Sequence, residues 1–171
     1  KVHFFENAHF YEAIFSGNVD FRKAQLDKTA DFSITDFSKE KYAYFWDVKF
    51  GGEAYFREAK FRGLIDFRKA QFSGSTGFLK AQFSEDASFN NARFGEDEFI
   101  FESARFHAAA NFIEAKFNGF ARFSDTRFHK SANFLGAKFR GSGALFKDSG
   151  AVYKSRENEI FHGFQTLNYF S

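Results

Sequence analysis

Apolar positions recur along this chain at a short, fixed interval. The tripeptide Ala-x-Phe, or a close variant of it, recurs from residue 2 to residue 146. Successive Phe positions lie alternately five and six residues apart, so that two units make one full repeat. The repeat is regular in Ala110-Asn111-Phe112, Ala115-Lys116-Phe117, Ala121-Arg122-Phe123, Thr126-Arg127-Phe128, Ala132-Asn133-Phe134 and Ala137-Lys138-Phe139. A short period sustained over most of a chain is typical of a solenoid.

The spacing within each unit predicts short extended segments and excludes helices. A five-residue and a six-residue step together make a repeat of 11 residues, and an apolar repeat of 11 residues can also indicate a right-handed coiled coil. At about 100° per residue, however, these positions spread around a helix and form no apolar stripe. A spacing of two matches an extended segment, whose alternate side chains point the same way. Each unit is therefore expected to bury its Ala and Phe and then turn a corner, with four units forming a coil of about 22 residues.

Several units match the consensus A-[D/N]-[L/F]-x-x, among them Ala30-Asp31-Phe32, Ala110-Asn111-Phe112 and Ala132-Asn133-Phe134. The pattern resembles the pentapeptide-repeat family, in particular its Phe-centred branch, where one extra residue separates pairs of pentapeptides. The resemblance covers roughly residues 2–149 and implies an all-β fold, a right-handed quadrilateral parallel β-helix of about 6.5 coils. A left-handed hexapeptide β-helix is the structural alternative, but it requires a strict six-residue step.

The sequence departs from that consensus in two ways. Lys, Arg or Gln replaces Asp or Asn in every second unit. Three steps are also widened, and we interpret them as corner bulges: Phe37 to Phe45, Phe94 to Phe101, and Phe139 to Phe146.

The length and the unbroken repeat predict one β-helical domain over residues 2–149. Residues 150–171 are expected to form a short C-terminal helical cap, because Ile160, Phe164 and Leu167 have helical spacing and Ser155 is a suitable N-cap. A linker into another domain is the alternative. The chain starts without Met inside a repeat unit, which suggests a fragment. No apolar run reaches the length of a membrane span, so membrane contact is expected only through a fused segment, and a cytoplasmic location is favoured.

Charge is nearly balanced, with 24 Lys and Arg against 22 Asp and Glu and a net charge of +2. Outward residues are expected to stack in columns, and one wall carries a candidate basic column of Lys49, Arg93, Lys116 and Lys138. The opposite wall is predicted to present Ile14, Asp36, Lys60, Gln82, Arg105 and Arg127. Acidic residues interleave nearby and the basic columns lack aromatic neighbours, which disfavours nucleic-acid binding.

A second candidate surface is apolar. Tyr44 and Trp46 flank Phe45 and are expected to face outward, with Tyr55 on the next wall. Other apolar residues in outward slots are Ile100, Ile113, Leu135 and Leu145. A contiguous apolar patch marks an interface. The alternative is that Tyr44 and Trp46 only support the inserted residues 39–42.

Candidate catalytic and metal-binding groups are sparse. His107 and His129 are expected to stack one coil apart, but two histidines without a third ligand make a weak metal site. The carboxylates are dispersed, no phosphate-binding or nucleophile motif occurs, and a convex prism lacks a catalytic pocket. We therefore expect neither enzyme activity nor a cofactor.

The leading hypothesis is a non-catalytic scaffold whose rigid walls bind a protein partner or a second copy of the chain. The family resemblance also implies an alternative, a DNA mimic that inhibits or protects a type II topoisomerase. Mimicry requires a strongly negative surface, which a net charge of +2 does not provide. Weak binding of an anionic polymer or membrane through the basic columns is a third possibility.

Overall fold

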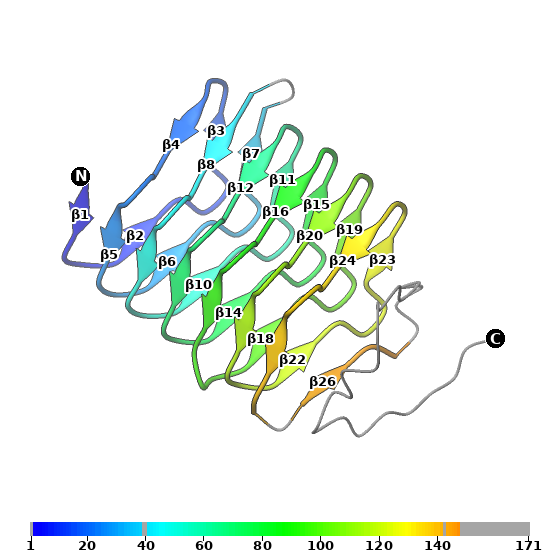
Figure 1. The fold of residues 1–171 in the computed structure, drawn as a ribbon. Helices are drawn as coiled ribbons and strands as arrows, with labels where there is room; N and C mark the ends of the chain where they lie inside the picture. The colour runs from blue at the N-terminus through cyan, green and yellow to red at the C-terminus, as the bar shows by residue number, and fades with distance from the viewer. Residues whose placement is uncertain (1, 39–40, 142, 148–171) are drawn as a thin grey trace.

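The structure is a computed structural model and describes residues 2–38, 41–141 and 143–147. These residues form a parallel β-solenoid of two-residue strands, arranged in four sheets that we call walls A to D (Figure 1). Wall A consists of β1 (His3–Phe4), β5 (Gln25–Leu26), β9 (Lys49–Phe50), β13 (Gln71–Phe72), β17 (Arg93–Phe94), β21 (Lys116–Phe117) and β25 (Lys138–Phe139). Wall B consists of β2 (Ala8–His9), β6 (Ala30–Asp31), β10 (Ala54–Tyr55), β14 (Thr76–Gly77), β18 (Phe99–Ile100), β22 (Ala121–Arg122) and β26 (Ala144–Leu145).

The remaining strands form the other two walls. Wall C consists of β3 (Ile14–Phe15), β7 (Asp36–Phe37), β11 (Lys60–Phe61), β15 (Gln82–Phe83), β19 (Arg105–Phe106) and β23 (Arg127–Phe128). Wall D consists of β4 (Val19–Asp20), β8 (Ala43–Tyr44), β12 (Ile65–Asp66), β16 (Ala87–Ser88), β20 (Ala110–Asn111) and β24 (Ala132–Asn133). The chain visits the walls in the order A, B, C, D, so that A lies opposite C and B lies opposite D.

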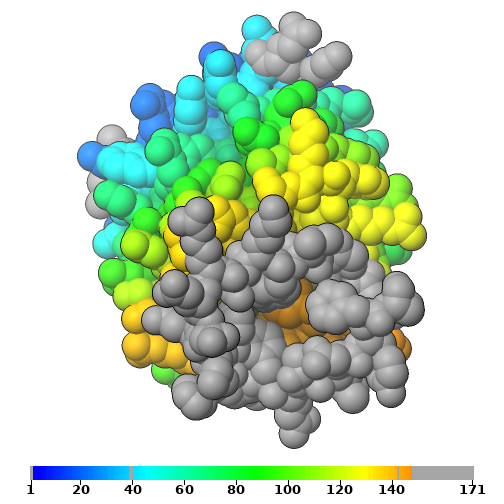
Figure 2. Space-filling model, turned by 45° about the vertical axis from the view of Figure 1, so that its right-hand side comes forward, coloured from blue at the N-terminus to red at the C-terminus, as the bar shows by residue number. Residues whose placement is uncertain are grey.

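Each strand pairs in parallel with the strand one coil later, so equivalent repeat positions lie directly above one another. On wall A, His3 pairs with Gln25, which lies four units further along the chain. The widened steps increase the sequence separation between paired residues, because Leu26 pairs with Phe50 and Thr76 pairs with Phe99 on the adjacent strands. The sheets continue across these steps, and the space-filling view shows successive coils as adjoining bands of colour (Figure 2).

Two kinds of corner explain the alternating interval of five and six residues. At a five-residue step the chain makes a tight turn, as where the Ala13 N–H donates to the Phe10 carbonyl over 3.0 Å. The third residue of each such turn has a positive φ, as at Glu12 (55°) and Ile34 (59°). At a six-residue step the extra residue widens the corner, and glycines such as Gly119 let successive coils approach closely.

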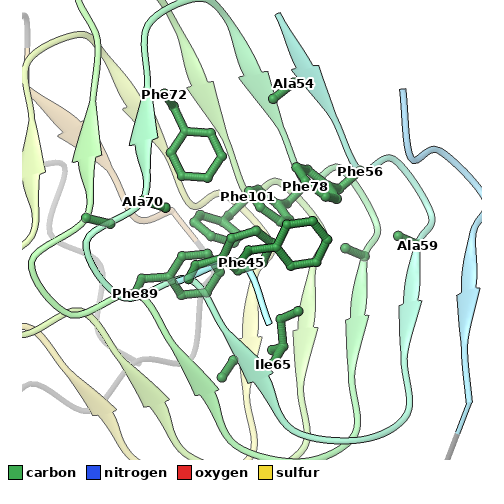
Figure 3. Close-up of a cluster of buried hydrophobic side chains, with 14 of the residues drawn as sticks. Phe45, Ala54, Phe56, Ala59, Ile65, Ala70, Phe72, Phe78, Phe89 and Phe101 are labelled. Atoms are coloured by element: carbon green, nitrogen blue, oxygen red, sulfur yellow. The ribbon is translucent and has the colours of Figure 1, made fainter. Parts of the chain in front are cut away.

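The Phe rings fill the axis of the solenoid as predicted. Rings of one wall stack along the axis, with centroids 4.6 Å apart for Phe56 and Phe78 and 4.8 Å apart for Phe78 and Phe101 (Figure 3). Rings from walls B and D interlock edge to face, as at Phe67 and Phe78, whose planes meet at 85°. The small Ala side chains are buried beside them and leave the rings room.

The expected helical cap over residues 150–171 lies outside the described residues. Within the described part of the chain, no helix has the length and apolar character that crossing a bilayer requires.

Candidate interaction surfaces

An aromatic cluster lies on wall D, at the end of the widened step from Phe37 to Phe45 in the sequence. Tyr44 belongs to β8, and its ring stacks on that of Tyr42, with the centroids 5.5 Å apart and the planes at 11°. The guanidinium carbon of Arg22, one coil earlier, lies 5.1 Å from the centre of the Tyr44 ring. Tyr44 therefore packs against both a second tyrosine and an arginine.

Trp46 lies just beyond β8, at the corner between walls D and A. The Lys23 ammonium of the preceding coil is 4.9 Å from the ring centre, and the Lys69 ammonium of the following coil is 5.9 Å away. Each cation–π contact at such a site contributes about 0.5–1 kcal/mol. We call Tyr42, Tyr44 and Trp46, with Arg22, Lys23 and Lys69, the aromatic cluster.

Carboxylates on the same wall orient two arginines. Arg22 Nη2 lies 2.6 Å from Asp20 Oδ2, and Arg68 Nη2 lies 2.8 Å from Asp66 Oδ2. The side-chain and backbone hydrogen bonds from Arg22 lower the pKa of Asp20, and the hydrogen bond to Asp66 raises the pKa of Arg68. Arg22 therefore contacts the Tyr44 ring from an anchored position.

The predicted apolar surface divides between opposite sides of the solenoid. Trp46, Ile113 and Leu135 share one column at the corner of walls D and A. A second column on wall B contains Tyr55, Ile100 and Leu145, interrupted by Gly77 and Arg122. Of these residues, Leu135 is 62% exposed and the other apolar ones are half-buried.

The prediction that Tyr55 lies one wall beyond Tyr44 was wrong. Two corners separate the two residues, because the chain turns once after Phe45 and again after Phe50. Tyr55 therefore lies on wall B, opposite Tyr44. Its burial, together with a hydrogen bond to Glu53, raises the pKa of Tyr55.

The structure places both basic columns where the sequence predicts them. On wall A, Lys49, Arg93, Lys116 and Lys138 stack in register with Gln71. Among the described residues, none of these four cations forms an ion pair. On the opposite wall C, the column runs Ile14, Asp36, Lys60, Gln82, Arg105 and Arg127.

Comparison with known families agrees with this repeat architecture. A family model described as pentapeptide repeats (9 copies) matches residues 10–60, 56–99 and 101–150. This chain belongs to the pentapeptide-repeat family. A comparison with curated proteins gives no match.

Two solved structures resemble this pentapeptide-repeat chain weakly. Both are trypsin-treated variants of QnrB1, described as a plasmid-mediated fluoroquinolone resistance protein. One is 13% identical with a TM-score of 0.28 and covers 88% of this chain and 84% of its own. The other is 15% identical with a TM-score of 0.24 and covers 86% and 85%. Such low TM-scores carry no inference about this chain.

The remaining candidate group is the histidine pair on this pentapeptide-repeat solenoid. The rings of His107 and His129 stack with centroids 4.8 Å apart and planes at 7°, as the register predicts. In the described part of the chain, no group of three or more His, Cys, Asp or Glu side chains is placed to hold a metal ion.

Sequence reasoning missed several exposed apolar residues. Phe5 is 66% exposed, Tyr11 is 53% exposed, and Tyr42 and Leu64 are each 43% exposed. Tyr42 and Leu64 directly precede the buried residues Ala43 and Ile65, a slot that faces outward on wall D. Scoring that slot for apolar residues would have found both.

Proposed function

We propose that this pentapeptide-repeat chain is a non-catalytic scaffold whose walls bind another protein or a second copy of the chain. The aromatic cluster on wall D is the observation that supports this proposal. Tyr, Trp and Arg are the residues enriched at the centres of protein interfaces. The cluster combines two tyrosines, the chain's single tryptophan and an arginine on wall D and its corner with wall A.

The rigidity of the cluster also favours binding. A partner loses affinity when interface side chains must be ordered, at about 0.5–1.5 kcal/mol for each flexible side chain. Here Trp46 already has Lys23 and Lys69 of the two adjoining coils near its ring, and Tyr44 already packs against Tyr42 and Arg22. Tyr44 lies on β8, which pairs with β4 and β12, and Trp46 follows that strand by two residues. We therefore expect a small entropic cost for ordering these side chains on binding.

Affinity capture with matched variants tests the proposal. Immobilised wild-type chain, a Tyr44→Ala/Trp46→Ala variant and an Ile14→Ala control on wall C are each exposed to the same cell extract. In parallel, sedimentation velocity measures self-association of the three proteins. We expect the wild type and the Ile14→Ala control to retain the same protein from the extract or to self-associate to the same extent. The Tyr44→Ala/Trp46→Ala variant should do neither. Identical behaviour of all three proteins would contradict the proposal.

Weak binding of an anionic polymer is a second candidate function. The column of Lys49, Arg93, Lys116 and Lys138 favours it, because these cations have no ion-pair partners among the described residues. Such binding to duplex DNA must fall steeply with added salt, since it depends on counterion release. Binding that is insensitive to salt excludes this mechanism.

DNA mimicry of the kind that inhibits or protects a type II topoisomerase is disfavoured. The net charge is +2, and basic residues occupy columns on two opposite walls. Inhibition of gyrase supercoiling at low protein concentration would contradict this interpretation.

The right-handed winding and the helical cap over residues 150–171 also stay proposals, as does a cytoplasmic location.

A further inference from the structure

The corner between β17 and β18 breaks the regular surface of the solenoid. It contains four residues, Gly95 to Glu98, where the coil before it has three, Ser73 to Ser75. The extra residue shifts the register, so that Thr76 pairs with Phe99 on the adjacent strand of wall B. The widened corner also replaces the small, neutral residues of its neighbour with Glu96, Asp97 and Glu98.

A surface depression of about 480 Å³ lies at this corner. Its volume falls within the range of about 300–1,000 Å³ that is usual for small-ligand sites. The polar side chains that line it are those of Gln71, Ser73, Arg93, Glu96, Asp97 and Asn118. They come from three successive coils, so the register of the β-ladder fixes their relative positions.

Charges of both signs border this depression without neutralising each other. Arg93, Glu96 and Asp97 are exposed, and among the described residues none of their side chains forms an ion pair or hydrogen bond. The adjacent Glu98 differs, because it pairs with Arg122 of the next coil. The charges at the depression are therefore available to a ligand.

We propose that this depression binds a ligand carrying both a carboxylate and an ammonium group. Arg93 recognises the carboxylate, since a guanidinium binds carboxylates through paired hydrogen bonds. Glu96 and Asp97 recognise the ammonium group, and the Gln71 and Asn118 amides supply further donors and acceptors. A free amino acid and a peptide with one basic and one acidic side chain both have this chemistry. The site lies at the corner of walls A and B, away from the aromatic cluster, and does not depend on the function proposed for that cluster.

Nuclear magnetic resonance of the 15N-labelled chain tests this site. The probes are L-alanine and three peptides with blocked ends, namely acetyl-Lys-Gly-Glu-amide and its Lys-Gly-Lys and Glu-Gly-Glu counterparts. We expect either L-alanine or the mixed-charge peptide to shift the backbone amides of Gly95, Asp97 and Asn118. Whichever binds more tightly identifies the source of the ligand. The two like-charged peptides should bind at least about tenfold more weakly.

Two variants make the test specific to the depression. Arg93→Gln should weaken binding about tenfold or more, whereas Lys49→Gln, on the same column but outside the depression, should leave it unchanged. Both positions are exposed, and unchanged amide spectra away from the substitution show that each variant is folded. The proposal fails if no probe shifts these amides, if all three peptides bind alike, or if both variants weaken binding equally.

Discussion

Ala and Phe are both buried in this solenoid, the Phe because its large ring fills the axis and the Ala because its small side chain leaves room for that ring. Phe56, Phe78 and Phe101 supply stacked rings that fill the axis, while Ala59 and Ala81 leave the backbone close to those rings. Where Thr replaces Ala, the hydroxyl needs a partner, and Thr126 donates to the Phe101 carbonyl over 2.8 Å. The Thr35 hydroxyl does the same to the Phe10 carbonyl.

Replacing one axial ring should therefore be costly. Phe78→Ala is expected to lower the free energy of unfolding by about 3–5 kcal/mol, because the neighbouring coils are tied in register and cannot collapse into the cavity. Phe5→Ala is the matched control, since Phe5 is 66% exposed, and it should change stability by less than about 0.5 kcal/mol. Urea unfolding followed by circular dichroism measures both. Equal losses in the two variants would show that Phe78 is not part of a packed axis.

At the scale of the elements, the corners determine how closely the coils approach. At Gly119, an added Cβ would overlap the backbone carbonyl oxygen of Asp97 in the coil before it. At Gly17, which lies at a corner of the same six-residue kind, a Cβ would meet nothing within 4 Å. The same residue type is therefore essential at one corner and replaceable at another.

Alanine substitution separates these two glycines. Gly119→Ala should destabilise the chain by about 1–3 kcal/mol, because two coils must move apart. Gly17→Ala should be neutral or slightly stabilising, since alanine restricts the unfolded chain. Thermal unfolding of the two variants measures the difference. A Gly119→Ala variant as stable as Gly17→Ala would contradict the close approach of these coils.

Ion pairs also connect elements in successive coils. Arg62 Nε lies 2.7 Å from Asp36 Oδ1, and this hydrogen bond, with the charges of Arg62 and Lys60, lowers the pKa of Asp36. A lowered pKa in the folded state means that the pair stabilises the chain above the ordinary pKa of Asp, about 3.9. That contribution is lost as the pH falls through the lowered value.

Asp36→Asn tests the sign of this linkage. At pH 7 the variant should be less stable than the wild type by about 0.2–1 kcal/mol, the usual range for a partly exposed pair. The difference should shrink below pH 4 as the wild-type carboxylate becomes protonated. Unfolding midpoints measured from pH 7 to pH 2.5 report it. A difference that stays constant over this range would show that the Asp36 charge has no role in stability.

The sequence predicted the strands and their columns well, because a repeat places each residue by counting. Lys116 and Lys138 lie in register as the period requires. The prediction for Tyr55 was wrong because two corners, and not one, separate it from Tyr44. The cation–π contacts of Trp46 were beyond counting, because they depend on how the Lys23 and Lys69 side chains cross between coils. The depression beside Arg93 was missed because the walls were assumed to be uniformly convex.

At the scale of the whole molecule, the four walls give the solenoid different chemistry on different sides. Walls A and C carry the basic columns, wall D carries the aromatic cluster, and wall B carries the column of Tyr55, Ile100 and Leu145. Every functional assignment for these walls depends on the coil register. If the register were different, these side chains would not share a surface.

Spin labelling measures that register directly, and the chain is suited to it because it contains no cysteine. Ser88 and Asn111 are partners on neighbouring strands of wall D, although a full coil of sequence separates them. Ser88 and Gly77 are closer in the sequence, only half a coil apart, yet they lie on opposite walls.

A chain labelled at Ser88→Cys and Asn111→Cys should show strong spin–spin broadening in its electron paramagnetic resonance spectrum, since adjacent strands lie about 4.8 Å apart. A chain labelled at Ser88→Cys and Gly77→Cys should show a spectrum without such broadening. Dilution with unlabelled protein excludes contacts between molecules. Strong coupling in the second pair and none in the first would contradict the four-walled coil.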